Sequence, residues 1–217
     1  MKKYLLLLLL VGSVAFAQEK PKFGVNLGGT YANIRGNEAA DKNKYDLNFL
    51  VGISVEVPLN ERFSFVGNVN YERKTFKNTI TAPIFIDENF DPIMNSRNVD
   101  VKVRLEYITL PLNLKYYFDS QKKVYINGGP FLGVFLDSTS KVEGEKTNED
   151  ANGLFKSLDF GANLGVGTNF KINEKNSLNL ELRHNYGLSN ISDVRVVGDG
   201  SVKTNSFNLI ANWQFGL

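Results

Sequence analysis

Hydrophobic and polar residues alternate with a period of two along most of the chain, and the last segment shows this clearly. In SFNLIANWQFGL, residues 206–217, one face carries Phe207, Leu209, Ala211, Trp213, Phe215 and Leu217. The other face is mainly polar or small, and such alternation predicts a β-strand. A final strand needs a partner for its backbone edge, and the earliest strand of the chain can supply it. The pattern therefore predicts a closed barrel.

The same period recurs in seven earlier segments. We expect strands at residues 22–33, 47–60, 63–76, 99–118, 123–137, 154–171 and 177–189, with the eighth at 206–217. Near Tyr107 the apolar residues change from one face of the strand to the other. This change predicts either a bulge or a strand whose first half lies outside the membrane, where no face has to be apolar. Gly128-Gly129-Pro130 predicts a second bulge, and the facing of 123–137 stays open.

The connections between these segments alternate between long and short. Short turns are expected at 60–62, 119–122 and 172–176, and long polar loops at 77–98, 138–153 and 190–203. Outer-membrane barrels have short periplasmic turns and longer external loops. The predicted fold is therefore all-β, an eight-stranded antiparallel up-and-down transmembrane β-barrel of the outer-membrane type.

A soluble lipocalin-type barrel would show the same alternation with its apolar face inward. The polar phase favours the membrane barrel, because it consists of Gly, Asn, Ser and Thr with only scattered charge, which suits a narrow lumen. Charged residues of this phase must pair, since an unpaired buried charge is costly. The candidates for ion pairs in the lumen are Glu56, Glu72, Lys115, Asp159, Glu181 and Arg183.

Aromatic residues near the predicted strand ends fit the two interfacial girdles of a membrane barrel. They are Phe23, Tyr31, Phe63, Tyr71, Phe118, Phe170, Tyr186, Phe207 and Trp213.

The N-terminus has the pattern of an export signal. Lys2 and Lys3 precede an apolar run at 5–11, and Ala15-Phe16-Ala17 is a small-x-small cleavage site. The apolar run is short for a membrane span of about 20 residues. We therefore expect a cleaved signal peptide at 1–17 and a barrel domain at 18–217.

Composition narrows the possible functions. The chain has no Cys, so it has neither a disulfide nor a lipid-anchored N-terminal cysteine. Removal of the signal lowers the 25 Lys and Arg residues by two, which leaves 23 against 23 Asp and Glu. A near-neutral chain without a basic cluster argues against nucleic acid as a partner.

Two segments resemble a known family. EYITLPLNLKYYF, residues 106–118, and GGPFLGVFL, residues 128–136, are similar to the PorT-like outer-membrane β-barrel proteins of Bacteroidetes. The resemblance implies an integral outer-membrane barrel of a Gram-negative bacterium. It implies no catalytic motif. The name-giving member is tied to a secretion and gliding system, but other members need not share that role, so the resemblance leaves the biological role open.

Candidate chemistry is sparse. His184 is the only histidine, so a multi-histidine metal site is excluded and a His-dependent lipid-modifying enzyme would have to centre on it. Asp87, Glu88 and Asp91 could meet a divalent cation but are better explained as solvated loop acids. The sequence thus predicts no catalytic, cofactor or metal site.

The preferred hypothesis is a non-enzymatic barrel with a structural, loop-mediated binding or secretion-associated role. Outer-membrane lipid is its expected partner, together with a protein bound through external loops or periplasmic turns. A pore for small solutes is the alternative, although side chains fill so small a barrel, and a lipid-modifying enzyme is the third possibility.

Overall fold

The computed structural model describes residues 20–85, 92–142, 149–150, 152–196 and 200–216. The predicted signal segment, the acids Asp87, Glu88 and Asp91, and Leu217 lie outside these residues. Eight long strands form the molecule: β1 (Lys22–Arg35), β2 (Lys44–Pro58), β3 (Phe63–Phe85), β4 (Pro92–Tyr117), β5 (Val124–Val142), β7 (Leu158–Lys171), β8 (Asn176–Gly187) and β9 (Lys203–Gly216).

Three short elements lie between the long strands: α2 (Glu38–Asp41), β6 (Glu149–Asp150) and the 3₁₀ helix η2 (Asn152–Leu154). The segment 154–157, predicted as the start of a strand, thus precedes β7. In the described residues, no helix is long and apolar enough to cross a membrane.

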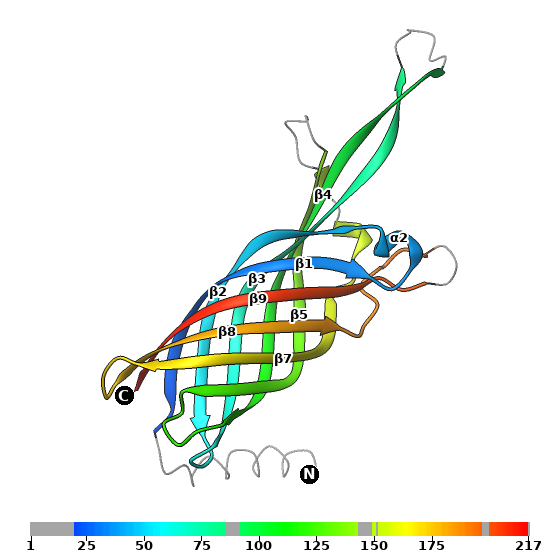
Figure 1. Ribbon diagram of the computed structural model, residues 1–217. Helices are drawn as coiled ribbons and strands as arrows, with labels where there is room; N and C mark the ends of the chain where they lie inside the picture. The colour runs from blue at the N-terminus through cyan, green and yellow to red at the C-terminus, as the bar shows by residue number, and fades with distance from the viewer. Residues whose placement is uncertain (1–19, 86–91, 143–148, 151, 197–199, 217) are drawn as a thin grey trace, which may run out of the picture.

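The strands form one closed antiparallel ring. The order is β4-β3-β2-β1-β9-β8-β7-β5, and β4 pairs with β5 to complete it. The first and last strands are neighbours from Lys22 opposite Gly216 to Arg35 opposite Lys203. This closure confirms the predicted eight-stranded barrel and leaves no free edge around its wall (Figure 1).

Three short turns lie at the same end of the barrel as the C-terminus (Figure 1). Each turn contains an Asn or Asp whose side chain accepts hydrogen bonds from two backbone amides: Asn60 from Arg62 and Phe63, Asp119 from Lys123 and Val124, and Asn173 from Lys175 and Asn176. Such side chains substitute for backbone partners in tight reversals. The local sequence therefore specifies this end of the barrel.

The opposite end differs from the prediction. The segment 77–98 is not a polar loop throughout, because β3 and β4 continue to pair out to Phe85 and Pro92. Likewise, 138–153 is partly strand, since β5 reaches Val142 and pairs with β6. These parts of the strands were predicted as loops because they contain many polar residues. Outside the membrane neither face of a strand must be apolar, so the alternation that identifies a strand is missing there.

The change of phase near Tyr107 has a different origin from a bulge in β4. Inward and outward side chains alternate without interruption from Leu105 to Tyr117, and the extra residue lies in β5, where Glu106 opposes Asp137 but Tyr107 opposes Phe135. The apolar residues before Tyr107 point inward because they fill the external mouth of the barrel.

The predicted bulge at Gly128-Gly129-Pro130 is wrong. These residues pair in an unbroken register with β7, from Gly128 opposite Leu164 to Pro130 opposite Ala162. The register to β4 is also the same on both sides of this segment. Because β5 is regular here, its odd-numbered residues from Tyr125 to Phe131 face the lumen, which settles the facing that the sequence left open.

Polar side chains of the barrel are buried inside it and apolar side chains are exposed on its outer wall. Asn26, Glu56 and Asn68 have at most 5 % of their surface exposed, whereas Leu27 and Leu209 each have 64 % exposed. This arrangement excludes the lipocalin-type alternative. Outward aromatic residues lie near both ends of the strands, with Phe23 stacked on Phe215 at the turn end and Tyr31 stacked on Tyr45 at the other.

Candidate functional site

The lumen is crossed by side-chain hydrogen bonds and ion pairs between strands that are not neighbours in the wall. All six predicted lumen residues, Glu56, Glu72, Lys115, Asp159, Glu181 and Arg183, are buried there, with 6 % or less of their surface exposed. They form three groups along the barrel, and Tyr125 contacts both the first and the second of these groups.

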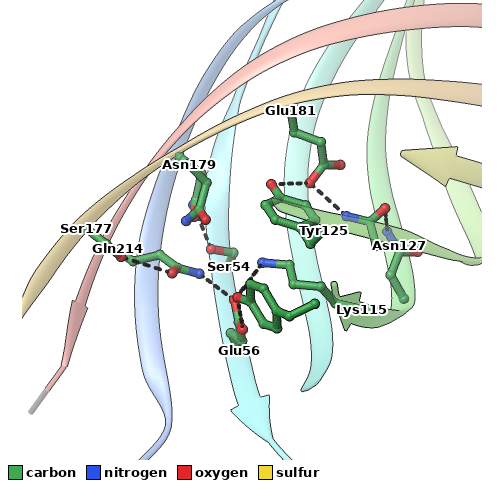
Figure 2. Close-up of polar contacts among 12 residues, drawn as sticks. Ser54, Glu56, Lys115, Tyr125, Asn127, Ser177, Asn179, Glu181 and Gln214 are labelled. Carbon is green, nitrogen blue, oxygen red and sulfur yellow. Dashed lines mark hydrogen bonds and ion pairs between the residues drawn. The ribbon is translucent and has the colours of Figure 1, made fainter. Parts of the chain in front are cut away.

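The first group surrounds Glu56 in the half nearest the short turns (Figure 2). Lys115 of β4 lies 2.7 Å from one carboxylate oxygen of Glu56 of β2. Gln214 of β9 donates to the same oxygen at 2.9 Å, and the hydroxyl of Tyr117 donates to the other at 2.7 Å. The Nζ atom of Lys115 also lies 4.2 Å from the ring centroid of Tyr125. Both charges are therefore compensated without bulk water.

The second group surrounds Glu181 of β8 (Figure 2). Its carboxylate accepts hydrogen bonds from Tyr125 at 3.0 Å and Asn127 at 2.8 Å, both on β5 across the lumen. Arg183, two residues further along β8, contacts the other carboxylate oxygen at 2.6 Å. Gly165 of β7 makes room for this group, because a Cβ atom there would lie 2.9 Å from Glu181.

Asparagine side chains of β1, β3, β8 and β9 form a further part of the lumen network. Asn26 of β1 donates to Asn68 and Asn70 of β3 at 3.0 and 2.8 Å, and it accepts from Asn212 of β9 at 2.6 Å. Asn179 of β8 donates to Asn212 at 3.1 Å. An amide both donates and accepts, so it can continue a network without burying a charge.

The third group lies toward the external end, where Asp159 pairs with Lys74 at 3.0 Å. The hydroxyl of Thr204 donates to Asp159 at 2.7 Å. Glu72, next to Lys74 on the inward face of β3, accepts a hydrogen bond from Asn208 at 3.0 Å.

Asp159 does not lie beside Arg183, although both residues face the lumen from adjacent strands. In the β7–β8 ladder Arg183 opposes Gly165, while Asp159 lies near the external end of β7. The neighbours of a residue on the adjacent strand depend on the strand register, and the sequence alone does not specify that register. Lys74 was missed, although it continues the phase of Asn70 and Glu72.

An apolar cluster covers the polar lumen at its external mouth. Buried Ile34, Phe76, Leu105, Tyr107 and Ile191 form it together with Ala40 of α2. Tyr107 packs edge-on against Phe135, with 5.6 Å between the ring centroids. The lumen is thus crossed by polar bridges and closed toward the outside by packed apolar side chains.

His184 lies outside this network, on the outer wall. Its ring stacks on Phe207 with 4.4 Å between the centroids, and Nε2 lies 2.6 Å from the side-chain oxygen of Asn205. These contacts bring no nucleophilic hydroxyl to the imidazole. Within the part of the chain that the structure describes, no group of three or more His, Cys, Asp or Glu residues could hold a metal ion.

A protein-family comparison matches residues 16–193 to the outer membrane protein beta-barrel domain. The chain belongs to this family. Together with the closed ring of eight strands, this makes it an outer-membrane β-barrel of Gram-negative type, whose strands lie in the lipid bilayer. No curated protein matched the sequence.

Several solved structures are similar in fold. Neisserial surface protein A is 17 % identical, with 90 % of this chain and 97 % of that chain covered and a TM-score of 0.47. OprG from Pseudomonas aeruginosa is 12 % identical, with 93 % and 99 % covered and a TM-score of 0.45. The outer membrane protease OmpT from Escherichia coli is 10 % identical, with 92 % and 97 % covered and a TM-score of 0.41.

Proposed function

We propose that this protein is a non-enzymatic outer-membrane barrel that presents an external β-hairpin to a protein partner. The hairpin, called the β3–β4 arm below, consists of residues 78–85 of β3 and 92–100 of β4 and projects beyond the other strands (Figure 1). β3 and β4 have 23 and 26 residues, whereas β1, β2, β7, β8 and β9 have between 12 and 15.

The unpaired edges of the β3–β4 arm carry this proposal. The pairing of β3 with β2 ends at Lys77 opposite Lys44, and the pairing of β4 with β5 begins only at Val101 opposite Val142. Within 78–85 and 92–100, each strand therefore has the other as its only partner among the residues that the structure describes. Open strand edges offer backbone donors and acceptors that an extended partner segment can bind by strand addition.

Photo-crosslinking in native outer membranes tests this function. A photoreactive amino acid at the exposed residue Thr81 should capture a specific protein, and the same amino acid at Glu174 in the opposite turn serves as the matched control. Replacement of residues 79–100 by Asn-Gly keeps Asn78 opposite Val101 and removes the arm. In this variant, photoreactive residues at other external positions should no longer capture the partner, and the heat-modifiable mobility of the barrel should be unchanged. Equal capture from Thr81 and Glu174 would contradict the proposal.

The lumen disfavours the pore alternative. Bridges such as Lys115 to Glu56 and Lys74 to Asp159 occupy the interior at two heights. We expect no conductance in planar bilayers, and steady ohmic conductance would favour a pore. The surroundings of His184 disfavour the enzyme alternative, and an unchanged lipid profile in a His184→Ala strain is the corresponding expectation.

The finer family assignment and the processing are also proposals. Residues 106–118 and 128–136 support membership of the PorT-like proteins of Bacteroidetes. The basic start, apolar run and Ala15-Phe16-Ala17 support cleavage after residue 17, which leaves residues 18–217 as the barrel domain. Mass spectrometry of the mature N-terminus, expected at Gln18, tests the cleavage site.

A further inference from the structure

Two adjoining hollows lie at the short-turn end of the barrel, between the β4–β5 turn and the β7–β8 turn. Their volumes are about 800 and 360 Å³, and they share Ser120, Gln121, Asn169 and Lys171. We call them together the turn-end pocket. Because outer-membrane barrels place their short turns in the periplasm, this pocket lies at the level of the inner leaflet of the outer membrane.

The turn-end pocket is strongly basic. Its lining contains five lysines, Lys22, Lys122, Lys123, Lys171 and Lys175, and one carboxylate, Glu174. In the described part of the chain, no ion pair joins Lys22, Lys123, Lys171 or Lys175 to an acid. The nearby carboxylate of Asp119 accepts the backbone amides of Lys123 and Val124, and it also interacts electrostatically with the Lys123 ammonium group without forming an ion pair with it.

Four cations at the other end of the barrel have a different environment. Arg73 and Arg104 both contact Glu106, at 3.2 and 3.1 Å, and Lys77 and Lys102 both contact Asp46, at 3.7 and 3.2 Å. Carboxylates of the chain itself therefore compensate these external cations. Among the described residues, Lys22, Lys123, Lys171 and Lys175 of the turn-end pocket form no ion pair with a carboxylate, so the pocket favours an anion that the protein does not supply.

The apolar surroundings identify the kind of anion. Phe170 lines the larger hollow and is 51 % exposed on the outer wall, while Phe118 and Ile172 are exposed beside the two turns. Lysines next to outward-facing aromatic side chains are typical of a membrane interface, where the ammonium groups meet lipid phosphates and the rings meet acyl chains. Ser120, Gln121 and Thr168 add hydrogen-bonding groups for a polar headgroup.

We propose that the turn-end pocket is a binding site for an anionic phospholipid of the inner leaflet, with the phosphate held by Lys123 and Lys171. A lysine near a membrane surface contributes about 1 kcal/mol to the attraction of anionic lipid, or about fivefold in affinity. Two lysines acting on one phosphate thus give a measurable lipid preference that depends on salt.

Electron paramagnetic resonance of spin-labelled lipids tests the site in reconstituted vesicles. We expect the barrel to prefer phosphatidylglycerol over phosphatidylcholine by about fivefold or more, and a Lys123→Gln/Lys171→Gln variant to prefer it by less than about twofold. A Lys44→Gln/Lys141→Gln variant is the matched control, because it removes two exposed lysines at the other end of the barrel. Heat-modifiable mobility verifies folding of each variant.

Three results would overturn the proposal. An equal loss of the preference for phosphatidylglycerol in both double variants would indicate that the overall surface charge, and not the turn-end pocket, attracts the lipid. Loss of the preference on adding inorganic phosphate at constant ionic strength would indicate a free-anion site. Co-sedimentation with isolated peptidoglycan that depends on Lys123 and Lys171, without a lipid preference, would indicate a cell-wall partner.

Discussion

The ammonium group of Lys115 lies 2.7 Å from the carboxylate of Glu56, and the two residues come from β4 and β2, which do not pair with each other. Their side chains have only 3 % and 2 % of their surface exposed. The ion pair therefore joins the two strands on either side of β3 across the inner face of the sheet.

Removal of Lys115 should destabilise the barrel strongly. In Lys115→Met the Glu56 carboxylate keeps hydrogen bonds from Tyr117 and Gln214 but loses its counter-ion. We expect a loss of about 3 to 5 kcal/mol in the free energy of unfolding. Reversible urea unfolding from lipid vesicles measures it, with Lys141→Met as an exposed control. A Glu56→Gln/Lys115→Met variant should recover part of the loss, and no recovery would contradict a charge-based origin.

Asp159 should be coupled to Lys74 and not to Arg183. A double-mutant cycle of Lys74→Met with Asp159→Asn should give an interaction free energy of about 1 to 3 kcal/mol, because the groups are 3.0 Å apart and buried. The matched cycle of Arg183→Leu with Asp159→Asn should be additive within about 0.5 kcal/mol. Strong coupling in the second cycle would contradict the register of β7 and β8.

The two faces of β8 should respond oppositely to charge. Arg183→Leu leaves the buried carboxylate of Glu181 without its counter-ion and should cost about 3 to 5 kcal/mol. Leu182→Arg places a charge on the lipid-facing wall and should cost about 2 to 4 kcal/mol near the bilayer midplane, and less near an interface. Unfolding from vesicles measures both variants. A harmless Arg183→Leu would contradict the inward position of this side chain.

Topology is accessible to labelling because the chain contains no Cys. A cysteine at Asp41, at the end of α2, should react with a membrane-impermeant maleimide on intact cells. A cysteine at Glu174, in the exposed β7–β8 turn, should react only after the outer membrane is opened. Labelling of Glu174 alone on intact cells would mean that the barrel has the opposite orientation.

The β4–β5 turn should lose stability in acid. The backbone amides of Lys123 and Val124 donate to the Asp119 carboxylate and hold its pKa below the ordinary aspartate value. Because the folded-state pKa is lowered, the contribution is present above the ordinary pKa and is lost as the pH falls through the lowered value. NMR shifts of the two amides should follow this titration, and Asp119→Asn should remove it. Titration at or above the ordinary value would contradict the interaction.

Local sequence determined the barrel and its membrane environment. Alternation with period two, as in Phe207 to Phe215, assigns one face of each strand to lipid and the other to the lumen, whatever its neighbours are. The short turns carry their own capping residues, such as Asn60 and Asp119, so their positions could also be predicted. These features depend on residues that are close together in the chain.

Only the tertiary structure decided which lumen residues meet. Glu56 and Lys115 are far apart in sequence, and their contact depends on strand register, tilt and closure, just as the pairing of Asp159 with Lys74 does. The strands at the external end also became evident only in the structure. There β3 and β4 extend beyond the membrane, and their sequences no longer alternate between a lipid-facing and a lumen-facing side. Sequence patterns record the environment of each face, whereas partners across a lumen are set by the geometry of the whole ring.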